Sequence, residues 1–179
     1  MDSTKKTMPE LQRLSVEEFH DSGKIPVILV LDDVRSMNNV GSVFRSADAF
    51  RIEGIYLCGY TPQPPHRDIQ KTALGATDTV TWKHFSDITE AIGALQNQQY
   101  HIYSIEQTRN SIPLHQIPLQ PSEKYALILG NEVHGVSDQA LASSEACIEI
   151  PQFGSKHSLN VAVSAGIVLW EVARSLHIH

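Results

Sequence analysis

The chain of 179 residues has few cysteines, few aromatic residues and no long hydrophobic run. Its two cysteines, Cys58 and Cys147, lie far apart in separate apolar segments, which favours two reduced, buried thiols over a disulfide or a metal site. No apolar stretch approaches the roughly 20 residues of a membrane span, and the polar residues 1–6 lack the apolar core of a secretory signal. These absences predict a cytoplasmic protein without a membrane segment and without a metal centre.

A basic excess is missing as well, because the formal net charge is −6. Nucleic-acid-binding domains normally carry a basic surface patch. Charge is screened over roughly 8 Å at physiological ionic strength, so a local cluster of cations could still hold a phosphate backbone. Taken one by one, the available cations are better explained as solvated surface residues; they are Arg35, Arg45, Arg51, Arg67, Lys71, Arg109 and Lys156.

What the sequence does contain is an alternation of strand-like apolar runs with helical patterns. Residues 26–31 form a branched apolar run typical of a strand buried on both faces, and residues 40–50 repeat apolar side chains at helical spacing, with Asn39 as a candidate cap. Further strands are expected at 55–58, 79–82, 102–105, 125–129 and 146–150, helices at 71–76, 88–95, 136–141 and 158–175, short helical turns within 9–21, and proline-rich loops at 60–67 and 107–122. This alternation predicts one α/β domain spanning residues 1–179, with a mostly parallel sheet, helices on both faces and a short N-terminal extension, residues 1–24.

Two apolar runs in the last third of the chain point to a ligand site. Residues 127–132 end their run at Gly130, which permits close approach to the backbone, and residues 148–151 end at Pro151, which removes an amide donor. With only a short helix between them, the two runs are expected to lie side by side and parallel, with their carboxyl ends opening onto one crevice. The crevice is the expected place for a small-molecule cofactor.

Three segments, residues 39–50, 129–137 and 150–163, resemble the motifs of the SpoU family, also called the TrmH family, of RNA ribose 2'-O-methyltransferases within the SPOUT superfamily. The resemblance covers about residues 25–175, with the motifs in the family's order. It implies an α/β fold whose C-terminal part forms a trefoil knot, a homodimer, and S-adenosylmethionine as the cofactor. It also implies an RNA substrate, methylated on a ribose 2'-hydroxyl.

The resemblance assigns roles to individual residues. The implied catalytic residues are Asn39, Arg45, Glu132, Ser158 and Asn160. The implied cofactor-binding residues are Leu129, Gly130, Asn131, Gly135, Ile150, Pro151, Ser158, Leu159 and Asn160. One position departs from the family pattern, because Val133 stands where glycine is common, and a side chain there could alter the loop of the pocket.

Each of these residues also has a purely structural interpretation. Asn39 could be a helix cap, Arg45 an exposed helix residue and Glu132 a surface carboxylate. Ser158 could be the N-cap of the last helix. Asn160 is expected too far inside that helix to cap it, which makes a structural role harder to assign.

The chemistry places a limit on what Arg45 can do. A free guanidinium stays protonated at pH 7, and removing its proton would cost roughly 7 kcal/mol. We therefore expect Arg45 to hold the adjacent phosphate and to stabilise the developing alkoxide. The dimer is expected to bring Arg45 near a cofactor pocket built partly by the partner chain.

Two other classes of function share this fold class. A nicotinamide-dependent oxidoreductase is disfavoured, because no two glycines are separated by a single residue and the G-x-G-x-x-G fingerprint is absent. A catalytically silent RNA-binding module remains as the alternative, and binding of S-adenosylmethionine would separate it from the enzyme. Among RNA substrates, the small size of the chain favours transfer RNA over ribosomal RNA.

Overall fold

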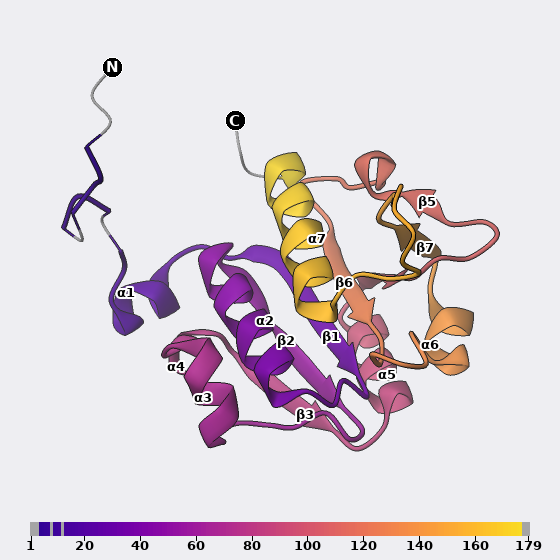
Figure 1. Ribbon diagram of the computed structural model, residues 1–179, viewed down its shortest axis with the longest axis horizontal. Helices are drawn as coiled ribbons and strands as arrows, with labels where there is room; N and C mark the ends of the chain where they lie inside the picture. Colours follow the sequence, from indigo (N-terminus) through magenta and orange to yellow (C-terminus); the bar gives the residue numbers. More distant parts are fainter. Residues whose placement is uncertain (1–3, 8, 12, 177–179) are drawn as a thin grey trace.

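The computed structural model describes residues 4–7, 9–11 and 13–176, and its centre is a sheet of parallel strands (Figure 1). The strand order across the sheet is β3-β2-β1-β6-β4-β7-β5. The strands are β1 (Ile25–Asp32), β2 (Ile52–Cys58), β3 (Trp82–Phe85), β4 (Tyr100–Ile105), β5 (Ile112–Pro113), β6 (Lys124–Leu129) and β7 (Ala146–Glu149). Every pairing between neighbouring strands is parallel, which confirms the expected α/β class.

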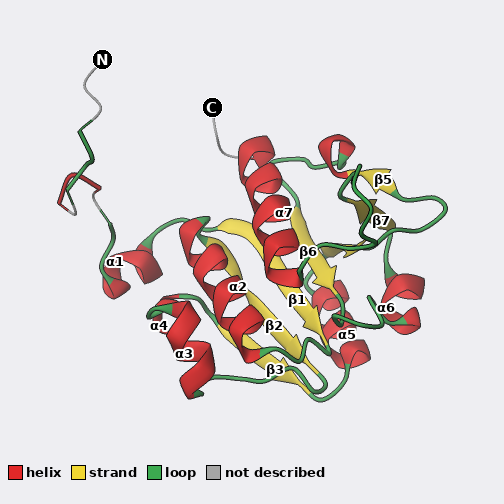
Figure 2. Cartoon of the chain, in the orientation of Figure 1, coloured by secondary structure: helices red, strands yellow, loops and turns green. Residues whose placement is uncertain are grey.

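Helices cover both faces of this sheet (Figure 2). The helices are η1 (Pro9–Leu11), α1 (Val16–Asp21), α2 (Met37–Ala49), α3 (Arg67–Ala73), α4 (Ala76–Thr79), α5 (Ile88–Asn97), η2 (Leu114–Gln116), α6 (Asp138–Ser143) and α7 (Val161–Leu176). Buried residues of α2, α3, α4 and α7 join the core cluster on one face, and those of α5 and α6 join the cluster on the other. No helix in the described part of the chain is long and apolar enough to cross a membrane.

Strand β1 shows why its sequence is apolar at nearly every position. Val27, Leu29 and Leu31 pack into the core that contains α2 and α7, whereas Ile28 and Val30 pack into the core that contains α5. Successive side chains of a strand point to opposite faces, so a central strand covered on both sides needs apolar residues at odd and even positions alike. The prediction of a doubly buried strand is confirmed.

The N-terminal extension is tied to this core. Short helical turns, η1 and α1, occur within residues 9–21 as expected. A capping box at Ser15 and Glu18 starts α1, and the buried ring of Phe19 joins the core cluster of the α2 face. The predicted extension, residues 1–24, falls partly outside the described residues.

The segment after the proline-rich loop differs from the sequence-based expectation. The helix expected at 71–76 is two helices, α3 and α4, and the strand expected at 79–82 starts three residues later as β3. His66 caps α3 earlier than expected, and the left-handed Leu74 and Gly75 end it and separate it from α4. Residues 107–122, expected to be a loop, also contain the short β5 and η2.

The two runs expected to lie side by side are not neighbours. Strand β6 pairs with β1 and β4, and β7 pairs with β4 and β5, so β4 lies between them. The expectation of adjacency was wrong because the order of parallel strands in a sheet is set by crossover connections and not by order along the chain. Their carboxyl ends nevertheless point the same way and bound one cavity.

Candidate functional site

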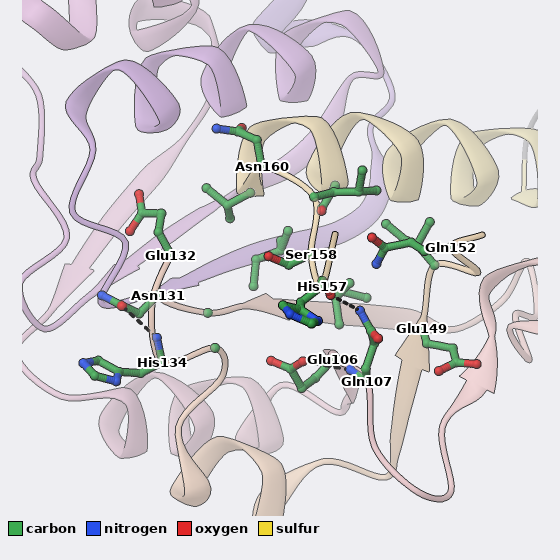
Figure 3. A pocket seen from close by; sticks show the side chains of 18 of the residues that line it. Glu106, Gln107, Asn131, Glu132, His134, Glu149, Gln152, His157, Ser158 and Asn160 are labelled. Atoms are coloured by element: carbon green, nitrogen blue, oxygen red, sulfur yellow. Dashed lines mark hydrogen bonds between the residues drawn. The ribbon is translucent and has the colours of Figure 1, made fainter. Parts of the chain in front are cut away.

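A cavity of about 580 Å³ lies at the carboxyl ends of β4, β6 and β7. Its walls come from the three strand ends and from the segment that leads into α7, and the lining residues are Ile105, Glu106, Gln107, Leu129, Gly130, Asn131, Glu132, Val133, His134, Gly135, Ile148, Glu149, Ile150, Gln152, His157, Ser158, Leu159, Asn160, Val161 and Ser164. Figure 3 shows Asn131 and Glu132 at one end of the cavity and Glu149 and Gln152 at the other. A crevice at the carboxyl ends of parallel strands is the usual ligand site of an open α/β sheet.

Glu132 joins the loop after β6 to the start of α2. Its Oε2 accepts a hydrogen bond from the backbone N of Arg35 at 3.1 Å, and its Oε1 accepts from the backbone N of Ser36 at 3.1 Å. The Nδ2 of Asn39 donates to the same Oε1 at 3.0 Å. A carboxylate beside the first amides of a helix is stabilised by those donors and by the helix dipole. Glu132 is therefore an ordered anion at the rim of the cavity.

The protonation of Glu132 follows from this environment. Partial burial raises the pKa of its carboxyl group, but the hydrogen bonds from the Arg35 amide, the Asn39 side chain and the Ser36 amide outweigh burial and leave the pKa below its usual value of 4.5. At neutral pH the group is therefore negatively charged.

Asn39 and Asn160 extend the same network to the last helix. The Nδ2 of Asn160 donates to the Oδ1 of Asn39 at 3.1 Å, and the Oδ1 of Asn160 accepts from the backbone N of Ala162 at 2.9 Å. Residues from α2, the loop after β6 and the start of α7 are thus linked in one chain of hydrogen bonds. Three of the residues implied by the resemblance lie together, although they are far apart in sequence.

Two expectations about helix caps are corrected by this geometry. Ser36, not Asn39, is the N-cap of α2, because the helix begins at Met37 and the Oγ of Ser36 accepts from the backbone N of Asn39. The last helix begins at Val161, so Asn160 is its cap and Ser158 lies before it. The sequence suggested an earlier start because Ser158 is a good cap residue and the following positions are apolar.

The buried side chain of Asn131 holds the loop after β6 through hydrogen bonds to its backbone. Its buried side chain donates through Nδ2 to the backbone O of Asp33 at 2.7 Å and accepts at Oδ1 from the backbone N of Val133 at 2.8 Å. Its backbone also pairs with that of Gly135 in both directions at 2.9 Å. Asn131 therefore organises the wall of the cavity as well as lining it.

The two glycines of this loop are required by packing. A Cβ on Gly130 would lie 2.1 Å from the backbone N of Val136, so the glycine serves a close approach of two backbone segments. Gly135 has a φ of +71°, and a Cβ there would lie 2.3 Å from the Oε2 of Glu106. Val133 is 81 % exposed and has no left-handed backbone, so valine fits its position without strain.

Sequence reasoning missed the contribution of β4. Glu106 follows this strand, and its Oε2 accepts from the backbone N of Val136 at 3.2 Å. The Nε2 of Gln107 donates to the backbone O of His157 at 3.0 Å. These two bonds tie the end of β4 to the loops on either side of it. The sequence signal was the polar pair Glu106 and Gln107 directly after an apolar run. That pair belongs to the cavity only because β4 lies between β6 and β7, which the sequence did not show.

Most residues that the resemblance assigned to the cofactor border this cavity. The exception is Pro151, which is exposed and does not line it. Of the implied catalytic residues, Asn39 and Arg45 do not line the cavity either: Asn39 contacts Glu132 at its rim, and Arg45 lies elsewhere. Arg45 is exposed on α2 and lines a second hollow of about 470 Å³ with Lys71 from α3. Within one chain the guanidinium and the cavity are therefore separate.

The charges of the two hollows are opposite. The cavity has Glu106, Glu132 and Glu149 in its lining and no Lys or Arg, whereas the second hollow has Arg45 and Lys71 and no Asp or Glu. Ligand pockets typically measure roughly 300–1,000 Å³ and combine apolar walls with a few polar groups. The cavity suits a small organic ligand that carries positive charge. In the described part of the chain, no three His, Cys, Asp or Glu side chains are grouped to hold a metal ion.

Fold and cavity together define the class: an open parallel α/β domain with a cavity of ligand size at the carboxyl ends of its central strands. The chain belongs to the SpoU rRNA Methylase family, whose model matches residues 26–170. The resemblance seen in three motifs is thereby confirmed.

Individual relatives agree with this membership. An uncharacterized tRNA/rRNA methyltransferase of Borreliella burgdorferi is 32% identical over 154 residues, which cover 84% of this chain and 65% of that protein. The 23S rRNA (guanosine-2'-O-)-methyltransferase RlmB of Blochmanniella floridana is 28% identical over 150 residues, or 84% of this chain and 58% of the relative. The AdoMet-bound rRNA methyltransferase from Sinorhizobium meliloti superposes with a TM-score of 0.80 at 26% identity, covering 88% of this chain and 60% of that one. The chain thus spans less than two thirds of the length of each of these relatives.

Proposed function

We propose that this protein is an S-adenosylmethionine-dependent RNA methyltransferase that acts on a ribose 2'-hydroxyl. The observation that carries the proposal is the acidic cavity at the carboxyl ends of β4, β6 and β7, in a chain of the SpoU family. The relatives support it, since one is a 23S rRNA guanosine-2'-O-methyltransferase and another was solved with AdoMet bound.

The residues of the cavity fit this cofactor. S-adenosylmethionine carries a sulfonium and an ammonium group, and the glutamates of the lining, with no lysine or arginine beside them, favour such cations. Leu129, Ile150 and Leu159 offer apolar surface for the adenine ring. A cofactor rich in phosphate, such as a dinucleotide, would find three glutamates and no lysine or arginine there.

When bound, the cofactor supplies an electrophilic methyl group for the ribose oxygen. The hydrogen-bonded chain of Glu132, Asn39 and Asn160 fixes the rim of the cavity and the first turn of α7. In our proposal Arg45 remains a cation, holds the RNA phosphate beside the target ribose, and stabilises negative charge that develops on the 2'-oxygen.

We further propose that the active form is a homodimer. The face of α7 that is turned away from the core carries Val163, Ile167 and Trp170, which are 51%, 37% and 53% exposed. Trp170 packs against Phe50, the C-cap of α2, with ring centroids 6.3 Å apart, so this apolar face adjoins the helix of Arg45. A second copy would cover the face and bring its own Arg45 toward the cavity.

The knot predicted by the resemblance belongs to the same proposal. The chain leaves β7 near one side of the sheet and returns to place α7 against α2 (Figure 1). This return path is compatible with threading of the C-terminal segment, and the family membership supports it. We also propose that residues 1–179 act as a single domain.

Calorimetric titration with S-adenosylmethionine, combined with transfer of a radiolabelled methyl group to RNA, tests the function. Leu159→Arg should abolish cofactor binding, because it places a cation in a cavity that has none. Phe153→Arg is the matched control, since Phe153 is 97% exposed and does not line the cavity. Wild-type protein that is folded but binds no cofactor would contradict the proposal and favour the silent RNA-binding module.

The RNA target is tested separately. The preference for transfer RNA over ribosomal RNA stays a prediction, and mapping the 2'-O-methyl sites lost from total RNA in a deletion strain decides it. Loss of a ribosomal site would overturn that preference and leave the reaction type unchanged.

A further inference from the structure

The hollow between α2 and α3 is a second concave place on the molecule. Its volume is about 470 Å³, and its lining residues are Ser42, Arg45, Ser46, Ala49, Phe50, Lys71 and Thr72. Of these, Arg45 has a role in the proposed function, whereas Lys71 has none.

The position of Lys71 is set by close packing of the two helices. A Cβ on Gly41 would lie 2.1 Å from the Oγ1 of Thr72 and 2.3 Å from the backbone O of Ile69, so only glycine permits this approach. The Oγ1 of Thr72 also donates to the backbone O of Asn38 at 3.0 Å. Because Lys71 is the neighbour of Thr72 on α3, this contact holds its backbone beside the helix of Arg45.

The two cations of the hollow lack internal partners. In the described residues neither Arg45 nor Lys71 makes an ion pair or a side-chain hydrogen bond, and no Asp or Glu lines the hollow. The hydroxyls of Ser42 and Ser46 donate to helix carbonyls, the first to Asn38 at 2.8 Å and the second to Ser42 at 3.2 Å. Two unpaired like charges repel each other, and a bound anion relieves that repulsion.

We infer that Lys71 binds a phosphate of the RNA backbone next to the one that Arg45 contacts, and so positions the target ribose. The inference rests on the proposed function, and Lys71 is a positioning residue, not a catalytic one. Arg45 and Lys71 line the same hollow, so an RNA strand that contacts Arg45 would pass beside Lys71. Lysine serves as a point charge that tolerates different phosphate positions. A basic patch this small is consistent with the net charge of −6, because screening limits its reach to about 8 Å.

Substitutions at Lys71 should separate binding from chemistry. Lys71→Ala should raise the KM for RNA about threefold to tenfold with kcat nearly unchanged, as expected for one exposed charge-assisted contact. Lys71→Arg should restore most of the affinity, and Lys71→Glu should weaken it further. Loss of one phosphate contact should also reduce the slope of log K against log salt by about 0.7–0.9.

Binding of bulk transfer RNA, followed by fluorescence anisotropy without cofactor, makes this test independent of turnover. Lys124→Ala is the matched control, because Lys124 starts β6 at the opposite end of that strand from the cavity. Affinity for S-adenosylmethionine and the melting temperature should not change in any Lys71 variant. Failure of the wild-type protein to bind the cofactor would count against the proposed function alone.

Two results would overturn the inference. One is a folded Lys71→Glu variant that binds bulk transfer RNA with wild-type affinity and salt slope. The other is a change of oligomeric state in Lys71→Glu, measured by size-exclusion chromatography with light scattering, because it would show that a partner chain and not RNA fills the hollow.

Discussion

At the scale of single residues, the site depends on asparagines that act as connectors. Asn160 caps α7 through Oδ1 and reaches Asn39 through Nδ2, so each half of its amide group has a separate task. Asn39 likewise accepts from Asn160 while donating to Glu132. An amide side chain offers a donor and an acceptor on separate atoms, whereas an ionised carboxylate only accepts and would lose the bond to Asn39.

Two substitutions at Asn160 should separate these tasks. Asn160→Asp keeps the acceptor for the helix cap but loses the donor to Asn39, so stability should hold while methylation falls. Asn160→Ala loses both and should lower the free energy of unfolding by about 1 kcal/mol as well. Urea denaturation and methyl-transfer assays on both variants provide the check. Equal stability of the two variants would contradict the capping role.

Glu132 should make stability depend on acid pH. Its folded-state pKa lies below the ordinary 4.5, so its contribution is fully present above that value and is lost as pH falls through the lower folded-state value. The difference in unfolding free energy between wild type and Glu132→Gln should be constant near neutral pH and shrink below pH 4.5. Urea titrations across this range measure it, and a difference that grows on acidification would refute the assignment.

At the scale of elements, the site is a meeting of loops whose backbones touch. The loop from Gly130 to Val136 closes on itself through Asn131 and Gly135, and Glu106 at the end of β4 braces it from the side. Such contacts leave no room for a Cβ at the glycines. The wall of the cavity is therefore determined by backbone geometry as much as by side chains.

Gly135→Ala should damage this wall. Alanine is disfavoured at a φ of +71°, and its Cβ would lie 2.3 Å from the Oε2 of Glu106, so we expect a loss of at least about 2 kcal/mol in unfolding free energy and weak cofactor binding. Gly154→Ala is the control, because nothing lies within 4 Å of its Cβ position. Thermal denaturation and cofactor titration compare the two, and similar behaviour of both variants would show that the loop tolerates a side chain.

At the scale of the whole molecule, the separation of Arg45 from the cavity is the main fact to explain. One hollow is acidic and the other is basic, and an exposed apolar face on α7 adjoins the basic one. A twofold arrangement of two chains would pair the basic hollow of each chain with the acidic cavity of the other. The active site would then exist only in the assembly.

Mixed dimers can test this arrangement. Arg45→Ala and Leu159→Arg should each be inactive alone, the first for lack of the guanidinium and the second for lack of cofactor. Co-expressed chains that mix randomly should regain about a quarter of wild-type activity, because half of the dimers contain one site with both intact parts. Methyl-transfer assays on the unfractionated mixture provide the measurement, and heterodimers purified through two different tags should show about half of wild-type activity, because one of their two sites has both intact parts. Mixed dimers without activity would mean that Arg45 serves the cavity of its own chain.

Some features of this protein followed from the order of its amino acids. Apolar residues at nearly every position of β1, helical spacing in α2 and the motif around Gly130 are local patterns, and they predicted the α/β class, most elements and the family. The ends of elements were less accurate. The predicted start of α3 is too late, because the helix directly follows the proline-rich loop. The sequence also favoured Ser158 as the cap of α7, because a cap is defined by hydrogen bonds that several nearby residues could make.

The tertiary structure alone decided which of these distant segments lie next to each other. It placed β4 between β6 and β7, which brought Glu106 into the cavity, and it placed Arg45 beside Lys71 instead of beside Glu132. Local sequence determines which backbone conformation a segment prefers, whereas crossover connections and the packing of helices on a sheet determine which distant side chains become neighbours. The sequence therefore predicted the chemical groups of the candidate site. It did not predict that these groups are divided between two hollows.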